Sequence, residues 1–383
     1  MRSSSRGLRF VGRARGLWLA APALVLACAW SSVAGAQQSP QGFAVERFYP
    51  AAPGGGWLVM DDLAMRGGLG GAIALTSGYA HNPLRVSDGV QSVNVVSDQA
   101  FFGVGLAVTY DRFRAYANLD SPLVVAGDSG KVGGYTLAGP NADLGKNPDG
   151  ISDPRVGFDV RLLGGPRSAL RVGVGAQLIF PNGNRSDYLS DGSYRAMGRV
   201  LVAGNVGLLA YAGHVGVHVR PLDDAPAPGS PVGSELLFGV AAGPRIPVGS
   251  RGHLVAVVGP EIYGQTAFRS FLSANATGVE ALFSARLEGT GDDGPQVRVK
   301  LGIGGGLDQR FGAPEWRMVF GIEVFDHSTD RDKDGVLDGK DACPDVPGIK
   351  TVDAKTNGCP AAVPDGYQAH DEGAAEAPDD SVK

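Results

Sequence analysis

Long uncharged apolar runs are missing from this sequence after residue 36, so no segment there is suited to be a transmembrane helix. An excess of positive charge is also missing, because the formal net charge of the chain is −5 at pH 7. Nothing in this balance points to a nucleic-acid partner. The charge is uneven: residues 326–383 hold 14 acidic and 6 basic side chains, whereas residues 37–325 are nearly neutral.

Recognisable catalytic motifs are absent as well. The sequence has no nucleophile elbow, no phosphate-binding loop and no evident pair of catalytic carboxylates. His214 and His218 lie four residues apart, and this pair supplies too few ligands for a metal site. We therefore predict structural roles for both histidines and a protein that is not an enzyme.

Cysteine is scarce, with three residues in the chain, and only Cys343 and Cys359 lie beyond residue 36. The first 36 residues resemble a secretory signal peptide: five arginines precede an apolar run at residues 17–30, and Ala-Gly-Ala follows at 34–36. We expect cleavage after this triplet, with a retained anchor or lipidation of Cys28 as alternatives. Since exported proteins form disulfides and each remaining cysteine precedes a proline, we predict a Cys343–Cys359 bond.

Glycine is abundant, with 59 residues, and many glycines lie in segments that alternate between apolar and small or polar residues. In VGFDVRL, residues 156–162, the apolar side chains occupy every second position. Strict period two indicates β-strand, and segments of about ten residues or more can cross a bilayer at a tilt. We predict twelve strands, at residues 69–87, 98–110, 112–124, 151–163, 168–181, 195–206, 208–221, 234–247, 253–266, 276–289, 295–308 and 314–325.

The links between these segments alternate between short and long. Short periplasmic turns and longer extracellular loops are typical of outer-membrane barrels. We therefore predict an all-β fold, an antiparallel transmembrane β-barrel of about twelve strands over residues 69–325, with a periplasmic segment at 37–68. The last strand should pair with the first, because an open sheet edge in lipid leaves amides unpaired. A soluble sandwich or barrel is the alternative.

The predicted inward row of the barrel is rich in charge, and basic groups outnumber acidic ones. One interpretation is a water-filled channel with a mild preference for anions. The other is a set of compensating ion pairs that fill a small barrel, and twelve strands fit either. The basic residues that we place on the lumen wall are Arg155, Arg161, Arg171, Arg298, Lys300 and Arg317.

The stretch from Asp330 to Asp341 has the pattern D-x-D-x-D-G-x-x-D-x-x-D. Carboxylates at its first, third and fifth positions can converge on one hard cation when the chain turns at the sixth-position glycine. A solvated acidic linker is the alternative, but it does not predict the glycine or the spacing. We predict a calcium site built from Asp330, Asp332, Asp334, the carbonyl of Val336, Asp338 and Asp341.

Together with the NGCP sequence at residues 357–360, this stretch resembles a thrombospondin type-3 repeat, which we place at residues 326–360. Such calcium-binding modules often follow the barrel in OmpA-like proteins. Four stretches resemble the barrel of OmpA-family proteins of myxobacterial type, at residues 43–50, 79–84, 150–157 and 312–317. The resemblance implies a structural, envelope or adhesion role.

The resemblance ends after the repeat. That family usually continues into a peptidoglycan-binding domain, whereas only 23 residues follow Pro360 here. Residues 361–383 have the composition of a disordered acidic tail. We therefore do not carry direct peptidoglycan binding over to this chain.

These features predict a non-enzymatic, OmpA-like barrel in the outer membrane of a Gram-negative bacterium. The calcium-binding repeat is expected in the periplasm. The alternative function is a passive, porin-like channel for small solutes, including anions. Expected partners are outer-membrane lipid, calcium ions and the barrel-assembly machinery.

Overall fold

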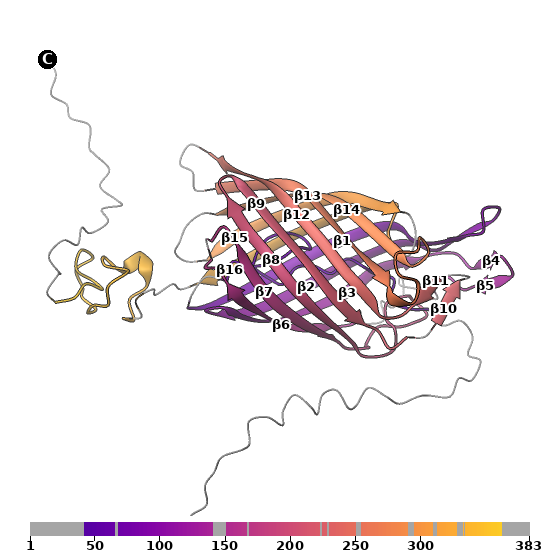
Figure 1. Ribbon diagram of the computed structural model, residues 1–383, viewed down its shortest axis with the longest axis horizontal. Coiled ribbons are helices and arrows are strands. Elements are labelled where there is room, and N and C mark those ends of the chain that lie inside the picture. Colours follow the sequence, from indigo (N-terminus) through magenta and orange to yellow (C-terminus); the bar gives the residue numbers. More distant parts are fainter. Residues whose placement is uncertain are drawn as a thin grey trace, which may run out of the picture. The chain divides into compact units, whose positions relative to one another are not determined.

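The computed structural model describes residues 42–65, 68–140, 151–166, 168–222, 224–227, 230–249, 254–289, 295–308, 312–327, 332 and 334–361. Twelve strands close into one antiparallel barrel (Figure 1). This confirms the predicted all-β fold class. The barrel strands are β1 (Leu69–Ser87), β2 (Ser92–Tyr110), β3 (Phe113–Ala126), β6 (Arg155–Leu163), β7 (Arg171–Ile179), β8 (Arg195–Val206), β9 (Leu209–Val219), β12 (Glu235–Val248), β13 (Leu254–Ala267), β14 (Thr277–Gly289), β15 (Gln296–Asp308) and β16 (Trp316–His327).

Two small hairpins lie in the long links of the barrel. β4 (Gly130–Val132) pairs with β5 (Tyr135–Leu137), and β10 (Asp224–Ala227) pairs with β11 (Ser230–Val232). We call the end of the barrel that carries the long links the loop mouth, and the end that carries the short links the turn mouth. The helical elements among the described residues are two 3-10 turns, η1 (Phe268–Ser270) and η2 (Asp338–Lys340).

No helix in the described part of the chain is long and apolar enough to cross a membrane.

Strand β16 shows how the alternating sequence closes the barrel. It pairs with β1 from Gly70 opposite His327 to His81 opposite Trp316, which confirms the predicted first-to-last pairing. Its outward side chains, Trp316 and Met318 among them, are exposed, whereas the inward ones are buried. Phe325 has the inward parity, and the Arg298 guanidinium lies 4.5 Å from its ring centroid.

The outer wall of the barrel is apolar on every strand. Exposed aliphatic and aromatic side chains form this surface, and a closed sheet leaves no unpaired edge beneath it. A wall of this kind suits lipid and not water, so the barrel spans a membrane. Representative outward residues are Leu75, Leu106, Phe158, Val200, Val240, Phe283, Leu301 and Phe320.

Residues 42–65, which we name the plug segment, run through the inside of the barrel. At the loop mouth, the Val45 amide donates to the Tyr188 carbonyl, 3.1 Å away in the link between β7 and β8. At the turn mouth, the Gly68 carbonyl, just beyond the segment, accepts from the Asp111 amide at 3.0 Å. The periplasmic position that we predicted for residues 37–68 is therefore wrong for the described residues 42–65, because the lumen wall supplies their binding partners.

Candidate functional site

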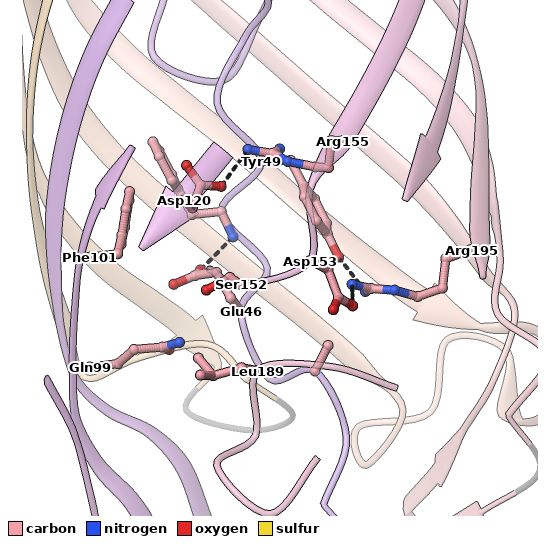
Figure 2. A pocket seen from close by; sticks show the side chains of 12 residues that line it. Glu46, Tyr49, Gln99, Phe101, Asp120, Ser152, Asp153, Arg155, Leu189 and Arg195 are labelled. Carbon is pink, nitrogen blue, oxygen red and sulfur yellow. Dashed lines mark hydrogen bonds and ion pairs between the residues drawn. The ribbon is translucent and has the colours of Figure 1, made fainter. Parts of the chain in front are cut away.

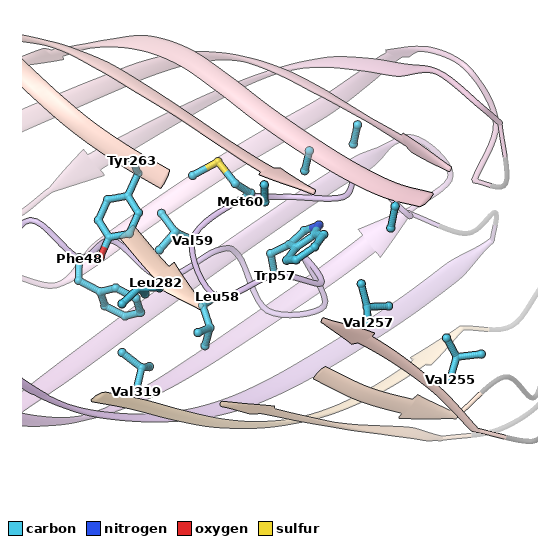
Figure 3. Close-up of a cluster of buried hydrophobic side chains, with 14 of the residues drawn as sticks. Phe48, Trp57, Leu58, Val59, Met60, Val255, Val257, Tyr263, Leu282 and Val319 are labelled. Atoms are coloured by element: carbon cyan, nitrogen blue, oxygen red, sulfur yellow. The ribbon is translucent and has the colours of Figure 1, made fainter. Parts of the chain in front are cut away.

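The middle of the plug segment forms an apolar core with the lumen wall (Figure 3). The Phe48 ring lies 6.0 Å from that of Phe101 and 6.4 Å from that of Tyr263. The glycine-rich inner wall makes room for the segment, because a Cβ atom at Gly239 or Gly302 would overlap plug side chains. Plug residues Phe48, Trp57, Leu58, Val59 and Met60 meet wall residues Val255, Val257, Tyr263, Leu282 and Val319.

The plug backbone has little regular structure, so its buried polar groups find partners in turns within the segment and in side chains of the wall. Glu261, fully buried on β13, accepts hydrogen bonds from three successive amides: Leu58 at 2.9 Å, Val59 at 2.8 Å and Met60 at 3.1 Å. The Lys300 ammonium donates to the Trp57 carbonyl at 3.0 Å. These bonds fix the segment in one position along the lumen.

Two arginines hold the end of the plug segment near the turn mouth. Arg161 donates to the carbonyls of Leu63, at 3.0 Å, and Met65. Arg171 donates through Nε to the carbonyl of Asp62 at 2.8 Å. Neither arginine binds a carboxylate in these contacts. Both donate to plug carbonyl oxygens, and Arg171 also donates to the Pro166 carbonyl, at 2.6 Å in the link between β6 and β7.

Ion pairs also join the plug segment to the wall. Arg114 binds Asp61 of the plug and Asp159 of β6, the latter at 2.6 Å. Arg317 lies 2.9 Å from both Glu46 of the plug and Glu280 of β14. These groups are almost fully buried except for Glu46, so removal of one partner would leave a buried charge uncompensated.

All six basic residues that we placed on the lumen wall are buried inside the barrel. Arg155 pairs with Asp120 at 2.8 Å, and Arg298 pairs with Glu288 at 2.7 Å and Glu323 at 2.9 Å. The remaining four are Arg161, Arg171, Lys300 and Arg317, and each of them contacts the plug segment.

Sequence reasoning placed carboxylates of the strands on the inward row but missed those that the plug segment and the links add to this network. Among the described residues, twelve cationic side chains and ten carboxylates are buried, and five of those ten carboxylates come from the plug segment or the links. The basic excess on the predicted lumen wall was the signal that could have found them, because buried charges need partners. The plug segment supplies negative charge that compensates this basic excess, through Asp61, Asp62 and the partly buried Glu46.

The loop mouth is closed over the plug segment. Phe43 and Val45 belong to an apolar cluster that includes residues of the β4–β5 hairpin, β11 and the long links. A buried ion-pair group holds the same end of the segment: Arg220 binds Asp191 and Glu235, each at 2.7 Å. Asp191 also accepts from the Ala44 amide at 2.9 Å, so the segment is anchored at this end too.

A cavity of about 50 Å³ remains beside the plug segment at the loop mouth (Figure 2). We name it the outer cavity. Two ion pairs cross its walls, Arg155 with Asp120 at 2.8 Å and Arg195 with Asp153 at 2.7 Å. Glu46 and Tyr49 of the plug segment also line it, and the Arg155 guanidinium lies 5.6 Å from the Tyr49 ring centroid.

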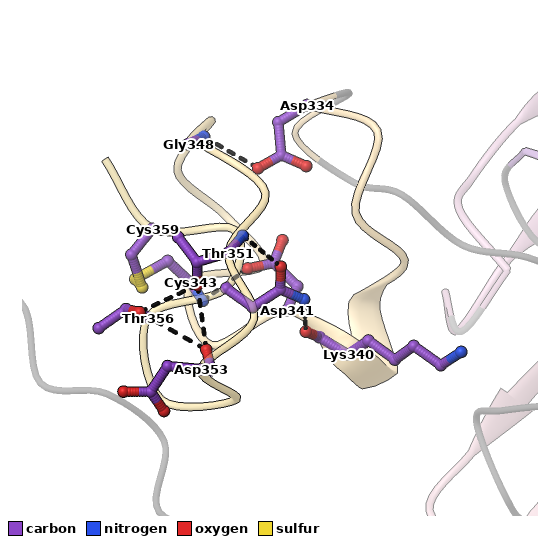
Figure 4. Close-up of a disulfide and its surroundings, with 10 residues drawn as sticks. Asp334, Lys340, Asp341, Cys343, Gly348, Thr351, Asp353, Thr356 and Cys359 are labelled. Atoms are coloured by element: carbon purple, nitrogen blue, oxygen red, sulfur yellow. Dashed lines mark hydrogen bonds between the residues drawn. A yellow bond between two sulfur atoms is a disulfide. The ribbon is translucent and has the colours of Figure 1, made fainter. Parts of the chain in front are cut away.

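The C-terminal repeat carries the other candidate site (Figure 4). The predicted disulfide is confirmed: Cys343 and Cys359 are bonded, with Cα atoms 5.0 Å apart. The Cys343 amide donates to Asp341 at 2.7 Å, and the Gly348 amide donates to Asp334 at 2.9 Å. The disulfide and these bonds position carboxylates in a module that has little regular structure.

The structure brings Asp332, Asp334 and Asp341 together, with one carboxylate oxygen of each within 4.8 Å of the others. We name these three residues the carboxylate cluster. Oδ2 of Asp341 is buried without a hydrogen-bond partner, and an all-oxygen set of this kind fits calcium. Asp338 begins η2 outside this cluster, Val336 is buried, and Asp330 lies outside the described residues.

The closed sheet with its apolar outer wall and the segment packed inside it together define a membrane-spanning barrel with an internal plug. No protein-family model matches the chain. Among solved structures, the COG4313 outer membrane channel from Pseudomonas putida F1 aligns with a TM-score of 0.42 and 13% identity, over 68% of this chain and 95% of that chain.

Two further solved barrels are similar at the level of the fold. The NanC porin aligns with a TM-score of 0.38 and 10% identity, over 67% of this chain and 99% of that chain. A FadL homologue from Pseudomonas aeruginosa has a TM-score of 0.34 and 10% identity, over 75% and 98% of the two chains. At these values, no activity is transferred from those proteins to this one.

Proposed function

We propose that this chain is a non-enzymatic, OmpA-like barrel of the outer membrane, with a structural or adhesion role in the envelope of a Gram-negative bacterium. The observation that carries the proposal is the filled lumen. Side chains of the plug segment pack against the wall, its amides bind Glu261, and its carboxylates pair with wall arginines. A lumen held closed at this many points favours an architectural role over free diffusion.

The C-terminal repeat adds a calcium-binding element to this proposal. β16 ends at the turn mouth, and short turns face the periplasm in outer-membrane barrels, so the repeat begins on the periplasmic side. Asp332, Asp334 and Asp341 would hold the ion, which supplies positive charge to three crowded carboxylates. The repeat would then be a stiff periplasmic extension of the barrel.

Conductance in a planar lipid bilayer tests the closed lumen. The wild-type barrel is expected to give no steady current, whereas deletion of residues 42–65 should give steady current through an opened lumen. Deletion of residues 130–137, the β4–β5 hairpin that packs over the loop mouth, is the control and should stay closed, because the plug segment still fills the lumen. Each protein is first shown to be folded by its heat-modifiable migration on a gel, so that current is read only from folded barrels.

A passive channel is the second candidate, and the outer cavity favours it. This cavity lies between the plug segment and the wall. It is lined by paired charges that can bind water and small ions. A channel would arise if the plug segment moved aside in part. Discrete current steps from the intact wild-type protein would support this function and contradict a permanently closed lumen.

A further inference from the structure

A polar cluster interrupts the apolar outer wall near the loop mouth, where β1 lies between β2 and β16. Register places three of its members side by side: His81 of β1 is paired with Trp316 of β16 and with Asp98 of β2. Tyr79 lies two positions before His81 on the same face. That face points outward, because Tyr79 is paired with Met318 and Met318 is exposed. We name Tyr79, His81, Asp98 and Trp316 the rim cluster.

The rings of the rim cluster lie against one another at the end of the lipid-facing rows. The Trp316 ring centroid is 4.9 Å from that of Tyr79 and 5.9 Å from that of His81, and Trp316 is 40% exposed. Toward the turn mouth, the outward rows of β1 and β16 continue with the exposed side chains of Leu75 and Phe320. Aromatic rings at such a level are usual in membrane barrels, because they suit the boundary between hydrocarbon and headgroups.

The Asp98 carboxylate is the unusual member, because it has no arginine or lysine partner among the described residues. Its Oδ1 atom accepts from the Tyr79 hydroxyl and from Nδ1 of His81, the latter at 3.2 Å. Oδ2 accepts from the Ser97 hydroxyl at 2.7 Å. The Asn82 amide nitrogen lies 3.2 Å from Nε2 of His81, so Nε2 is the acceptor and the ring carries its proton on Nδ1. All three donors are therefore neutral, and they leave the negative charge of Asp98 uncompensated.

A second carboxylate at the same rim is compensated within the chain. Glu315 lies 3.8 Å from the Arg85 guanidinium, and its amide donates to the His81 carbonyl at 2.9 Å. Asp98 differs from it only in lacking such a cation. The Asp98 side chain is 31% exposed, so a group from outside the protein can reach it. An ionised carboxylate on a wall that faces lipid is costly without a partner, and the missing partner is a cation.

We propose that the rim cluster binds the ammonium group of a membrane-lipid headgroup. Asp98 supplies the opposite charge, and the neighbouring rings of Trp316 and Tyr79 supply the aromatic surface that attracts cations. The acyl chains of the same lipid then lie along the apolar outward rows of β1 and β16. A headgroup with phosphate and no ammonium would be repelled by Asp98. The site requires lipid around the wall and is independent of whether the lumen conducts.

Competition between two lipids tests the headgroup preference on the wild-type protein. The full chain in detergent micelles is mixed with equal amounts of phosphatidylethanolamine and phosphatidylglycerol that have the same acyl chains. Native mass spectrometry then counts the lipids that remain bound. Phosphatidylethanolamine, which carries an ammonium group, should be retained in preference. Equal retention of the two lipids, or a preference for phosphatidylglycerol, would overturn the proposal.

Two carboxylate variants locate the site on the barrel. Asp98→Asn keeps the size of the side chain and should weaken phosphatidylethanolamine binding about fivefold, as expected for one partly exposed charge contact. Glu315→Gln removes the carboxylate that Arg85 already compensates, and it should keep the wild-type preference. Both variants are first shown to be folded by heat-modifiable migration on a gel. A wild-type preference in Asp98→Asn, or an equal loss in both variants, would show that the rim cluster is not the binding site.

Discussion

Single residues decide whether an irregular segment can remain inside this barrel, and Glu261 is the clearest case. Its carboxylate binds three successive plug amides, while its side chain is fully buried. Buried amides of an irregular backbone need acceptors from elsewhere in the protein. One carboxylate thus accepts hydrogen bonds from three plug residues that also belong to the apolar core.

Substitution of Glu261 tests this role. Glu261→Leu leaves three buried amides without an acceptor, which should destabilise the folded barrel by at least about 3 kcal/mol. The free energy of unfolding, measured by urea titration in liposomes, reports the loss. Glu315→Leu removes a partly exposed carboxylate and should change it little. Similar losses in both variants would contradict the role of Glu261.

The carboxylate cluster predicts a pH dependence of the repeat. Burial, with repulsion from Asp334 and Asp332, raises the pKa of the Asp341 carboxyl above its ordinary value. The folded, ion-free repeat therefore holds this proton more tightly than the unfolded one, and its stability falls as pH rises through the raised pKa. Calcium should instead lower the pKa of the Asp341 carboxyl below its ordinary value, because the cation favours the ionised carboxylate.

Carbon NMR of the Asp341 carboxyl checks this prediction. In chelator, the carboxyl should titrate above the pKa of an ordinary aspartate, and in excess calcium below it. Asp353, whose carboxylate is outside the cluster, is the internal reference and should not respond to calcium. An Asp341 titration that is identical in chelator and calcium would show that no ion binds there.

At the scale of elements, the barrel strands could be predicted, whereas the plug segment and the two small hairpins could not. Segments such as residues 156–162 carry their own period of two, and β6 forms there. The plug segment has no period, and it combines Asp61 and Asp62 with buried Trp57 and Met60. Its burial depends on wall residues far away in the sequence, as with Leu58 and Glu261, and no local pattern reports such pairs.

In the C-terminal repeat, too, one feature could be predicted from the sequence and another could not. Two cysteines, each before a proline, in a chain with an export signal were enough to predict the disulfide, because both lie within one short stretch. The hydrogen bond from the Cys343 amide to Asp341 was not visible in the sequence, although it links the disulfide to the carboxylate cluster. The disulfide is therefore expected to support ion binding.

Removal of the disulfide tests that link. The double variant Cys343→Ser and Cys359→Ser should bind calcium about tenfold more weakly, because about 1.4 kcal/mol or more of chain entropy must then be lost on binding. Calorimetry on the full chain in detergent measures the affinity. Unchanged affinity in the double variant would show that the cluster forms without the bond.

At the scale of the whole molecule, the apolar outer wall determines that lipid and not water surrounds the barrel. Val240 faces outward in the middle of β12 and is 60% exposed. Val240→Lys should destabilise the barrel in liposomes by about 2–4 kcal/mol, as for lysine at the bilayer midplane. Val352→Lys, at a fully exposed position in the repeat, is the control and should be neutral. A neutral Val240→Lys would mean that water surrounds the wall.

The plug segment precedes β1 in the chain, and this order has a consequence for biogenesis. Export delivers the segment to the membrane before any of the strands that surround it. The strands can wrap around a peptide that is already in place, because the first and last strands, β1 and β16, are the pair that closes the barrel. A circular permutant that carries the segment after β16 would have to thread it into a finished cylinder, and its maturation should be slower for that reason.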